Sequence, residues 1–365
     1  MVKSKSEDFM GGNNFWTGKK VLITGHTGFK GAWLSQWLVE MGANVTGLAL
    51  GPNTTPNLYS ILNLKSKMIS VIGDIRDLKV LYETIRKHEP EIVFHLAAQA
   101  LVHDSYEDPL GTLITNIIGT ANILEAIRTS NTVKVIVNVT SDKCYQNDEL
   151  SIAFVESDKM GGNDIYSCSK GCSELVTEAY RKSFYRDHQA IIVTARAGNV
   201  IGGGDWSKDR LVPDIIKAFI KGENVSLRNP LSIRPWQHVL EPLSGYITLA
   251  EKCYYNNRKY EGAWNFGPGD NGELTVETLT EAMAKTWGED AHWNKAENIF
   301  SPESNFLKLD CTKAKNILDW ESNLTIDETI MWTVDWYKKM YQHENMEAYT
   351  INQISRYIER RKKNV

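Results

Sequence analysis

Val21-Leu-Ile-Thr-Gly25-His-Thr-Gly28-Phe-Lys-Gly31 is the stretch that decides the fold, because an apolar run leads through spaced glycines into the helical pattern of residues 32–41. Gly25 permits a tight turn, Gly28 lets backbone N–H groups approach a pyrophosphate, and Gly31 lets the helix pack closely. The amino end of the helix also favours an anion. Such a spacing alone is as often an ordinary turn, but a buried strand before it and a helix after it predict a dinucleotide site. We expect the lining of that site to include Thr27, Phe29 and Lys30.

The same alternation of strand and helix continues along the chain. Apolar, β-rich runs predict strands at residues 20–24, 45–50, 68–72, 92–96, 133–139 and 190–195, with helical patterns between them. Near-continuous apolar strands are buried on both faces, and alternation with helices implies right-handed crossovers. The sequence therefore predicts an α/β fold with a doubly wound, Rossmann-like parallel sheet.

The regular alternation of strand and helix ends near residue 202, where a smaller, mixed carboxyl-terminal substrate lobe is expected to begin. Helical patterns lie near 212–221 and 240–254, and short strands near Val225 and Trp264. We expect a flexible tail at 1–16, a mainly dinucleotide-binding domain at 17–201, a mainly substrate-binding lobe at 202–345 and a carboxyl-terminal extension at 346–365. Some exchange of chain between the two domains is expected.

Composition excludes several classes of protein. The 365 residues carry a net charge of -4, which gives no general attraction for nucleic acid or anionic membranes. We find no signal sequence, and no segment that approaches the roughly 20 apolar residues needed to cross a bilayer. The five cysteines are scattered, at neither disulfide nor zinc-ligand spacings. We therefore expect a cytoplasmic protein with no metal site and no nucleic-acid or membrane partner.

Small and acidic residues at other strand ends extend the dinucleotide site. Asp74 and Ile75 follow the third strand, where a carboxylate can accept a hydrogen bond from adenine; Asp74 is equally well explained as the cap of a helix at 76–88. Small residues after the fourth strand let a cofactor lie against backbone at Leu96, Ala97 and Ala98. No cation ends the second strand to receive a 2′-phosphate, so we expect NAD.

Tyr166 and Lys170 are four residues apart at the start of a helical stretch, so one helix face carries both side chains. An ammonium near a phenol, with the positive nicotinamide close by, lowers the tyrosine pKa from about 10 and makes a base. The spacing is common by chance, but Ser141, Asp142 and Lys143 follow the fifth strand and reach the same rim. Ser141 can hydrogen-bond the oxygen from which Tyr166 takes a proton.

With these residues assembled, the chain resembles the extended short-chain dehydrogenases/reductases, and among them the nucleotide-sugar 4,6-dehydratases. The resemblance covers nearly everything from Lys19 to Tyr341, including Arg196-Ala-Gly-Asn-Val-Ile-Gly202, Trp264-Asn-Phe-Gly267 and Lys313-Ala-Lys-Asn-Ile-Leu-Asp-Trp320. It implies that Tyr166 takes the proton of the sugar 4-hydroxyl while hydride passes to NAD. Water then leaves from carbons 5 and 6, and hydride returns to carbon 6.

Two departures from the usual pattern narrow the resemblance. Most dehydratases carry Asp-Glu after the serine or threonine, whereas this chain has Asp142-Lys143. Asp142 can protonate the leaving hydroxyl, and Lys143 is either a base with a depressed pKa or an electrostatic stabiliser of the enolate. The string from Ser141 to Tyr145, Gly202-Gly-Gly-Asp-Trp-Ser207 and Arg234-Pro-Trp-Gln-His-Val239 resemble the subgroup acting on CDP-D-glucose.

That resemblance implies a place in the synthesis of deoxy and dideoxy sugars, as in the O-antigen of lipopolysaccharide. It also implies that the diphosphate is held by Asn199 and Arg234, with Arg210 as a helper. Family members dimerise through helices near residues 109–128 and 166–185, so a homodimer or a dimer of dimers is expected. Two alternatives stay open, a nucleotide-sugar 4-epimerase and a non-catalytic NAD-binding module.

Overall fold

A seven-stranded sheet forms the centre of the molecule, and all of its strands run parallel. The computed structural model describes residues 15–148, 152–227, 229–255, 258–269, 272–288, 291–295 and 306–364. The strand order is β3-β2-β1-β4-β5-β6-β11. The bounds are β1 Lys20–Thr24, β2 Asn44–Ala49, β3 Ile69–Ile72, β4 Ile92–His95, β5 Val135–Val139, β6 Ile191–Arg196 and β11 Gly262–Asn265. The predicted parallel, doubly wound fold is confirmed.

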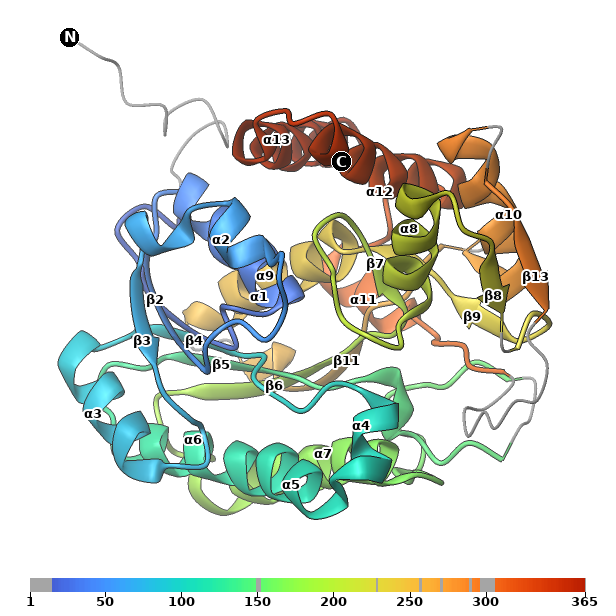
Figure 1. Cartoon of the computed structure of the whole chain (residues 1–365). Helices are drawn as coiled ribbons and strands as arrows, with labels where there is room; N and C mark the ends of the chain where they lie inside the picture. Colours follow the sequence, from blue (N-terminus) through green and yellow to red (C-terminus); the bar gives the residue numbers. More distant parts are fainter. Residues whose placement is uncertain are drawn as a thin grey trace, which may run out of the picture.

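Helices cover both faces of this sheet (Figure 1). One face carries α1 (Phe29–Glu40) and α9 (Leu240–Tyr254), and the other carries α3 (Leu78–His88), α6 (Gly119–Arg128) and α7 (Ile165–Phe184). Successive residues of a strand point to opposite faces, so Val93 and Ile136 join the core under α3, α6 and α7, while Phe94 and Val137 join the core under α1 and α9. Both faces are therefore buried, as the continuous apolar runs require.

Two elements that follow residue 202 belong to the sheet layer. Helix α9 packs against β5 and β6, and β11 pairs with β6 from Gly262↔Val193 to Asn265↔Arg196. The strand near Trp264, expected among the elements of the second lobe, belongs to the main sheet instead, which is one case of the exchange of chain expected between the two domains. Its pairing partner lies more than 60 residues earlier, and a four-residue strand carries no local sign of such a partner.

The remaining carboxyl-terminal elements form short sheets and helices beside the central sheet (Figure 1). Strand β7 pairs with β10, β8 with β13, and β9 with β12. The strands are β7 Val200–Ile201, β8 Val225–Leu227, β9 Ile233–Pro235, β10 Gln237–His238, β12 Glu273–Thr275 and β13 Trp293–Lys295. The helices are α8 Leu211–Lys221, α10 Val276–Trp287, α11 Thr312–Leu318, α12 Ile326–Tyr341 and α13 Met346–Asn364. Short helices earlier in the chain are α2 Leu58–Ile61, α4 Val102–Glu107 and α5 Pro109–Leu113.

Two expectations about exposed or apolar segments are wrong. Trp16 does not belong to a loose tail, because its side chain is fully buried and its indole N–H donates to Glu251; residues 1–14 of the predicted tail lie outside the described residues. The segment Pro109–Arg128 is long and apolar enough to cross a membrane by length and composition, although none was expected. It packs against α7, and 44% of its apolar window is buried inside the protein.

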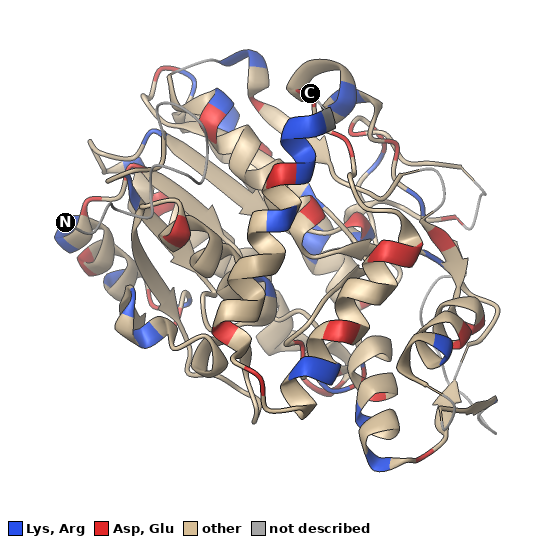
Figure 2. Cartoon of the chain, turned by 90° about the horizontal axis from the view of Figure 1, so that it is seen from above, with Lys and Arg blue, Asp and Glu red and all other residues tan. Residues whose placement is uncertain are grey.

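Helix α13 lies across the outside of the α1 and α9 layer and carries basic residues at its carboxyl end (Figure 2). Its Tyr357 is buried and donates a 2.7 Å hydrogen bond to Glu241 Oε2 on α9. Glu241 Oε1 accepts the backbone N–H groups of Asn323 and Leu324. One buried carboxyl group thus joins α9, the loop before α12, and α13.

We expect Tyr357→Phe to loosen α13, because it removes a donor from a buried carboxyl group. The loss of such a partner costs about 1–3 kcal/mol. Hydrogen exchange of the α13 amides should become faster, and the denaturation midpoint should fall. Tyr341→Phe, at a tyrosine that is 60% exposed, is the matched control and should change neither. Equal protection of α13 in both variants would contradict this account of how the helix is held.

Candidate active site

The glycine turn between β1 and α1 has the geometry that its sequence predicts. Gly25 has a φ of +80°, and a Cβ atom there would lie 2.8 Å from the Ala97 nitrogen. A Cβ atom at Gly31 would lie 2.0 Å from the Gly25 carbonyl oxygen, so only glycine permits this approach of helix to turn. Gly28 caps α1 without a side-chain hydrogen bond, which leaves the first-turn amides available to an anion.

The other predicted dinucleotide contacts surround this turn. Thr27 Oγ1 donates to the Leu50 carbonyl, and the Ala97 N–H donates to Thr24 Oγ1. Leu96, Ala97 and Ala98 follow β4, and Ile75 is buried after β3. The geometry brings these residues to the same edge of the sheet, where their contact with a cofactor stays a prediction.

Asp74 does not cap a helix. Its carboxylate accepts the backbone N–H and the guanidinium of Arg76, and these bonds hold the Asp74 pKa below its usual range. The cap of α3 is Asp77, which accepts the N–H groups of Lys79 and Val80. The helix starts at Leu78, two residues later than predicted, because Asp77 caps it better than Asp74 could.

Ser141, Asp142 and Lys143 form a tight turn after β5 and face the start of α7. Asp142 begins a 3-10 turn, and Ser141 caps it by accepting the Lys143 N–H. Ser141 donates a 2.9 Å hydrogen bond to Asp142 Oδ1, and its hydroxyl also lowers the Tyr166 pKa. Ser141 and Asp142 are therefore joined directly, and Tyr166 lies near enough for Ser141 to affect its protonation.

Lys170 lies one turn beyond Tyr166, with its Nζ atom 6.0 Å from the phenol ring centre. In this structure burial raises the Tyr166 pKa to about 12 and lowers the Lys170 pKa to about 8. The expectation that Lys170 lowers the tyrosine pKa is wrong for the protein by itself. The free-energy cost of burying a phenolate outweighs the neighbouring groups that stabilise it and so raises the pKa. Ser141 and Arg210 are the groups that lower the pKa.

Asp142 is the most deeply buried carboxyl group of the site, at 1% exposure. Burial raises its pKa despite the neighbouring charges of Lys143 and Arg234. Its Oδ2 atom has no hydrogen-bond partner among the described residues and lies against Gly198, where a Cβ atom would be only 1.6 Å away. A buried carboxyl group with a raised pKa and one unsatisfied oxygen suits an acid that awaits an oxygen atom.

Lys30 reaches this centre from the first turn of α1. Its amino group lies 3.2 Å from the hydroxyl of Tyr246 on α9. Burial and the nearby charges of Lys170 and Arg210 lower its pKa to about 7, and Asp142 opposes that shift. The sequence placed Lys30 near the cofactor, but nothing in the helical pattern of α9 singled out Tyr246.

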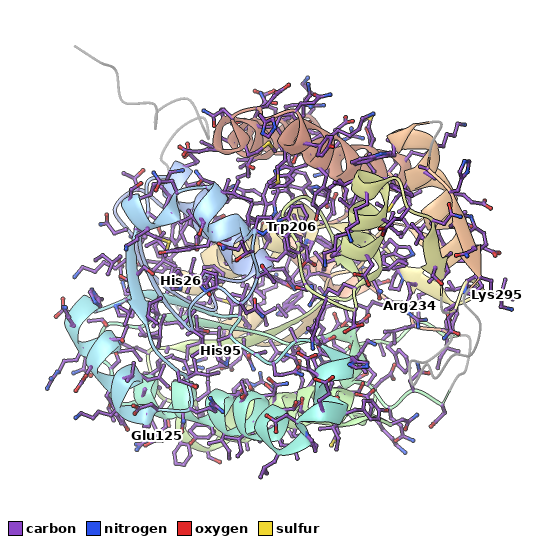
Figure 3. The ribbon with its side chains drawn as sticks, in the orientation of Figure 1. His26, His95, Glu125, Trp206, Arg234 and Lys295 are labelled. Atoms are coloured by element: carbon purple, nitrogen blue, oxygen red, sulfur yellow. The ribbon has the colours of Figure 1, made fainter. Side chains whose placement is uncertain are left out.

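The predicted substrate residues come from segments of the chain that follow β6. In Figure 3, Trp206 and Arg234 come from the carboxyl-terminal elements, while His26 comes from the turn after β1 and His95 from the end of β4. Asn199 has a φ of +46° and a buried Oδ1 without a partner among the described residues. Arg210 donates to Asp205 Oδ2 at 3.0 Å, and Arg234 is 4% exposed. Their contact with a diphosphate stays a prediction.

Gln237 was missed as a site residue. Its amide nitrogen donates to the carbonyls of Gly198 and Phe266, and its Oε1 is buried without a partner in the described part of the chain. The indole N–H of Trp206 is also buried and has no hydrogen-bond partner among the described residues. Gln237 belongs to the motif from Arg234 to Val239, which the sequence does single out. Within that motif only the charged Arg234 was predicted to bind substrate.

A cluster of possible metal ligands lies outside this centre. His103, Asp104 and Glu107 on α4 offer atoms within 4.8 Å of one another. They are also ion-paired with the loop before α8, since Lys208 lies 3.2 Å from Asp104. Exposed acidic groups of this kind are common, and we assign no metal to them.

Comparison with known proteins agrees with this geometry. The family model described as GDP-mannose 4,6 dehydratase matches residues 22–333. The chain belongs to this family. A CDP-glucose 4,6-dehydratase of Salmonella typhimurium is 49% identical over 350 residues, covering 94% of this chain and 98% of that protein. A UDP-glucose 4-epimerase of Mycoplasma pneumoniae is 27% identical, covering 89% of this chain and 99% of that protein.

The fold matches solved structures over almost their whole length. A dTDP-glucose 4,6-dehydratase of Bacillus anthracis, solved in complex with NAD, has a TM-score of 0.74 and 22% identity. The match covers 90% of this chain and 99% of that one. At this level of identity the match supports the Rossmann-like sheet with its carboxyl-terminal lobe.

We expect Gly31→Ala to destabilise the protein, since its methyl group would lie 2.0 Å from the Gly25 carbonyl oxygen. Overpacking of this kind costs about 1–3 kcal/mol, which should appear as a lower melting temperature. The control is Gly51→Ala, whose added Cβ has no neighbour within 4 Å among the described residues. It should change stability by less than about 1 kcal/mol. Equal melting of the two variants would show that the close approach is not required.

Proposed function

We propose that this protein is an NAD-dependent CDP-D-glucose 4,6-dehydratase that forms CDP-4-dehydro-6-deoxy-D-glucose and water. The observation that carries the proposal is Asp142, a buried acid near Tyr166 with a raised pKa and an oxygen that has no partner among the described residues. Elimination needs an acid in addition to the tyrosine and lysine pair. The 49% identical relative supports CDP-D-glucose as the substrate. The site would serve a route to deoxy sugars, such as those of O-antigens.

The dinucleotide edge of the sheet fits NAD. The turn from Gly25 to Gly31 offers first-turn amides to a pyrophosphate, and Asp74 lies at the adenine end. Residues 49–53 at the end of β2 carry no cation for a 2′-phosphate. When bound, NAD accepts a hydride from carbon 4 of the sugar and returns it to carbon 6.

The residues of the chain divide the proton chemistry among them. Tyr166 takes the proton of the 4-hydroxyl, with Lys170 one turn away on the same helix and with Ser141 and Arg210 favouring its phenolate. Asp142 protonates the leaving 6-hydroxyl. Lys143, on the same turn, would receive the carbon 5 proton or stabilise the enolate that its removal forms. The guanidinium groups of Arg210 and Arg234, with Asn199, would hold the diphosphate.

An epimerase is the second candidate, because the 27% identical relative is one and the fold and the Tyr166/Lys170 pair would serve it equally. An epimerase has no use for an acid buried in this way, since it eliminates no hydroxyl. A non-catalytic module has no need of an ordered tyrosine and lysine pair. The raised pKa and the unpartnered oxygen of Asp142 therefore favour the dehydratase.

Supplied with CDP-, UDP- and dTDP-glucose in turn, the enzyme should remove one molecule of water from the CDP sugar. Product mass measures this directly. Asp142→Asn should lower the rate by about 10²–10⁴-fold, the usual contribution of a general acid. Asp187→Asn, at an exposed aspartate, is the control and should leave the rate unchanged. An unchanged mass with inverted stereochemistry at carbon 4 would support the epimerase instead.

We also propose a cytoplasmic homodimer or a dimer of dimers. The five cysteines are free thiols, as a reducing compartment allows. Helices α5, α6 and α7 pack side by side as the outer layer of one face of the sheet (Figure 1). That layer exposes apolar side chains, namely Leu110, Ile118, Leu175 and Phe184, each at least half exposed. Apolar side chains of this size on one layer are typical of a protein interface.

Leu175→Glu should shift the assembly toward monomers, because a charge would enter the apolar interface. Leu231→Glu changes another exposed leucine, in the carboxyl-terminal lobe, and should leave the assembly intact. Light scattering after size exclusion gives the molar mass of each variant. If Leu175→Glu keeps the mass of the unmodified protein, the proposed interface is not the one used.

A further inference from the structure

The side chains that would meet the substrate are largely covered in this structure. Tyr166 is 8% exposed, Asp142 1% and Arg234 4%. A nucleotide sugar is much larger than a water molecule, so it reaches these side chains only if a covering segment moves aside. Residues 205–210, which lie between β7 and α8, have attachments that suit such a movement.

The two ends of this segment are fixed to each other and to α12. The Asp205 N–H donates to the hydroxyl of Tyr337 at 3.1 Å, and that hydroxyl donates to the Asp205 carbonyl at 2.7 Å. At the other end, Arg210 donates to Asp205 Oδ2 at 3.0 Å. Left-handed backbone at Gly204, with a φ of +84°, turns the chain just before the segment. Residues 205–210 therefore form a compact loop with a fixed base, and residues 207–209 are its tip.

Ion pairs on the surface attach the tip of this loop to α4. Lys208 Nζ lies 3.2 Å from Asp104 Oδ1 and 3.7 Å from Glu107 Oε2. His103 Nδ1 lies 3.9 Å from Asp209 Oδ2. The side chains of Lys208 and Glu107 are each 59% exposed. Water and salt weaken such pairs, so they can open without any loss of packing in the core.

Both partners in this attachment border the catalytic tyrosine. Helix α4 packs against α7, and Tyr106 of α4 interacts electrostatically with Asp164, the cap of α7. Tyr166 follows that cap by two residues. From the carboxyl-terminal side, Arg210 at the base of the loop lies near enough to Tyr166 to lower its pKa. The ion pairs thus join two parts of the chain that lie next to the site.

We propose that residues 205–210 are a strap over the entrance of the site, that Lys208 holds the strap closed on α4, and that its opening admits the nucleotide sugar. The proposal rests on the function proposed above, which brings a nucleotide sugar to Tyr166. Opening breaks the ion pairs of the tip, while the bonds of Asp205 keep the base in place. The strap therefore controls how fast substrate enters and product leaves.

The association rate constant of a fluorescently labelled CDP, measured by stopped flow, tests the strap in Lys208→Gln. Loss of a cation weakens the attraction of an anionic nucleotide and would by itself slow association. Loss of the clasp has the opposite effect, because the protein spends more time open. We expect association to become about two- to fivefold faster, the range that the strength of exposed ion pairs allows. Dissociation should become faster as well.

Two further variants separate the clasp from the charge. Lys208→Arg keeps a cation that can pair with Asp104 and Glu107, so it should keep the rates of the unmodified protein. Lys221→Gln removes the same charge from a lysine whose side chain is 64% exposed near the end of α8, and it should not accelerate association. All three substitutions lie at exposed side chains and leave the core unchanged.

An association rate that is unchanged or lower in Lys208→Gln would overturn the strap. Faster dissociation with unchanged association would also overturn it, since a residue that only positions bound substrate acts on the complex alone. Failure of CDP to bind any variant would refute the proposed substrate, and the strap with it. If CDP binds with these rates but CDP-glucose loses no water, the strap stands and the dehydratase is refuted.

Discussion

The buried ion pair between Glu174 and Arg196 holds the two halves of the catalytic centre together. Glu174 lies one turn after Lys170 on α7, and Arg196 ends β6. The guanidinium Nη2 and the carboxylate Oε2 are 2.8 Å apart, and both side chains are about 5% exposed. The same carboxylate accepts Thr140, the neighbour of Ser141, and Thr194 on β6. The pair therefore fixes the distance between the turn that carries Asp142 and the helix that carries Tyr166.

The ion pair between Glu174 and Arg196 also orders residues outside α7 and β6. Arg196 Nη1 donates to the hydroxyl of Tyr145, which donates in turn to Asn265 at the end of β11. Both ends of the turn from Ser141 to Tyr145 are thus tied to one charged pair. Such a pair gains little net stability from its own attraction, because both charges had to leave water. Removing one partner would leave a buried charge at a cost of about 3–5 kcal/mol, so the network specifies the geometry of the site.

The sequence predicted those parts of the fold that short-range patterns determine. The strand predicted at 20–24 and the helix predicted at 240–254 coincide with β1 and α9, because apolar runs and helical periodicity are local properties. The membership of β11 in the main sheet and the burial of Trp16 depend on partners far away in the chain. No periodicity in Gly262–Asn265 distinguishes an edge strand of the large sheet from a strand of a small one.

The catalytic residues could be predicted because their spacing repeats known geometry. A helix turn brings Lys170 beside Tyr166, and parallel strands deliver Ser141 and Asp142 to the same edge as the glycine turn. The polar lining contributed by Tyr246 and Gln237 was missed, because α9 and β10 reach the centre only through packing against parts of the chain that are distant in sequence. The direction of the Tyr166 pKa shift was wrong for a related reason. Neighbouring charges can be named from a sequence, whereas the cost of burial depends on everything packed around the group.

Burial also determines the direction in which the pKa of each acid and amine in this crowded site is shifted. Three basic side chains interact electrostatically with Asp142, namely Lys30, Lys143 and Arg234. By charge alone they would hold its carboxyl group ionised, yet desolvation is the larger effect and raises its pKa. The same desolvation lowers the pKa of Lys30 to about 7 and that of Lys170 to about 8. Opposite shifts of acid and amine have one cause, so the packing that desolvates these groups raises the pKa of the acid and lowers the pKa of the amines together.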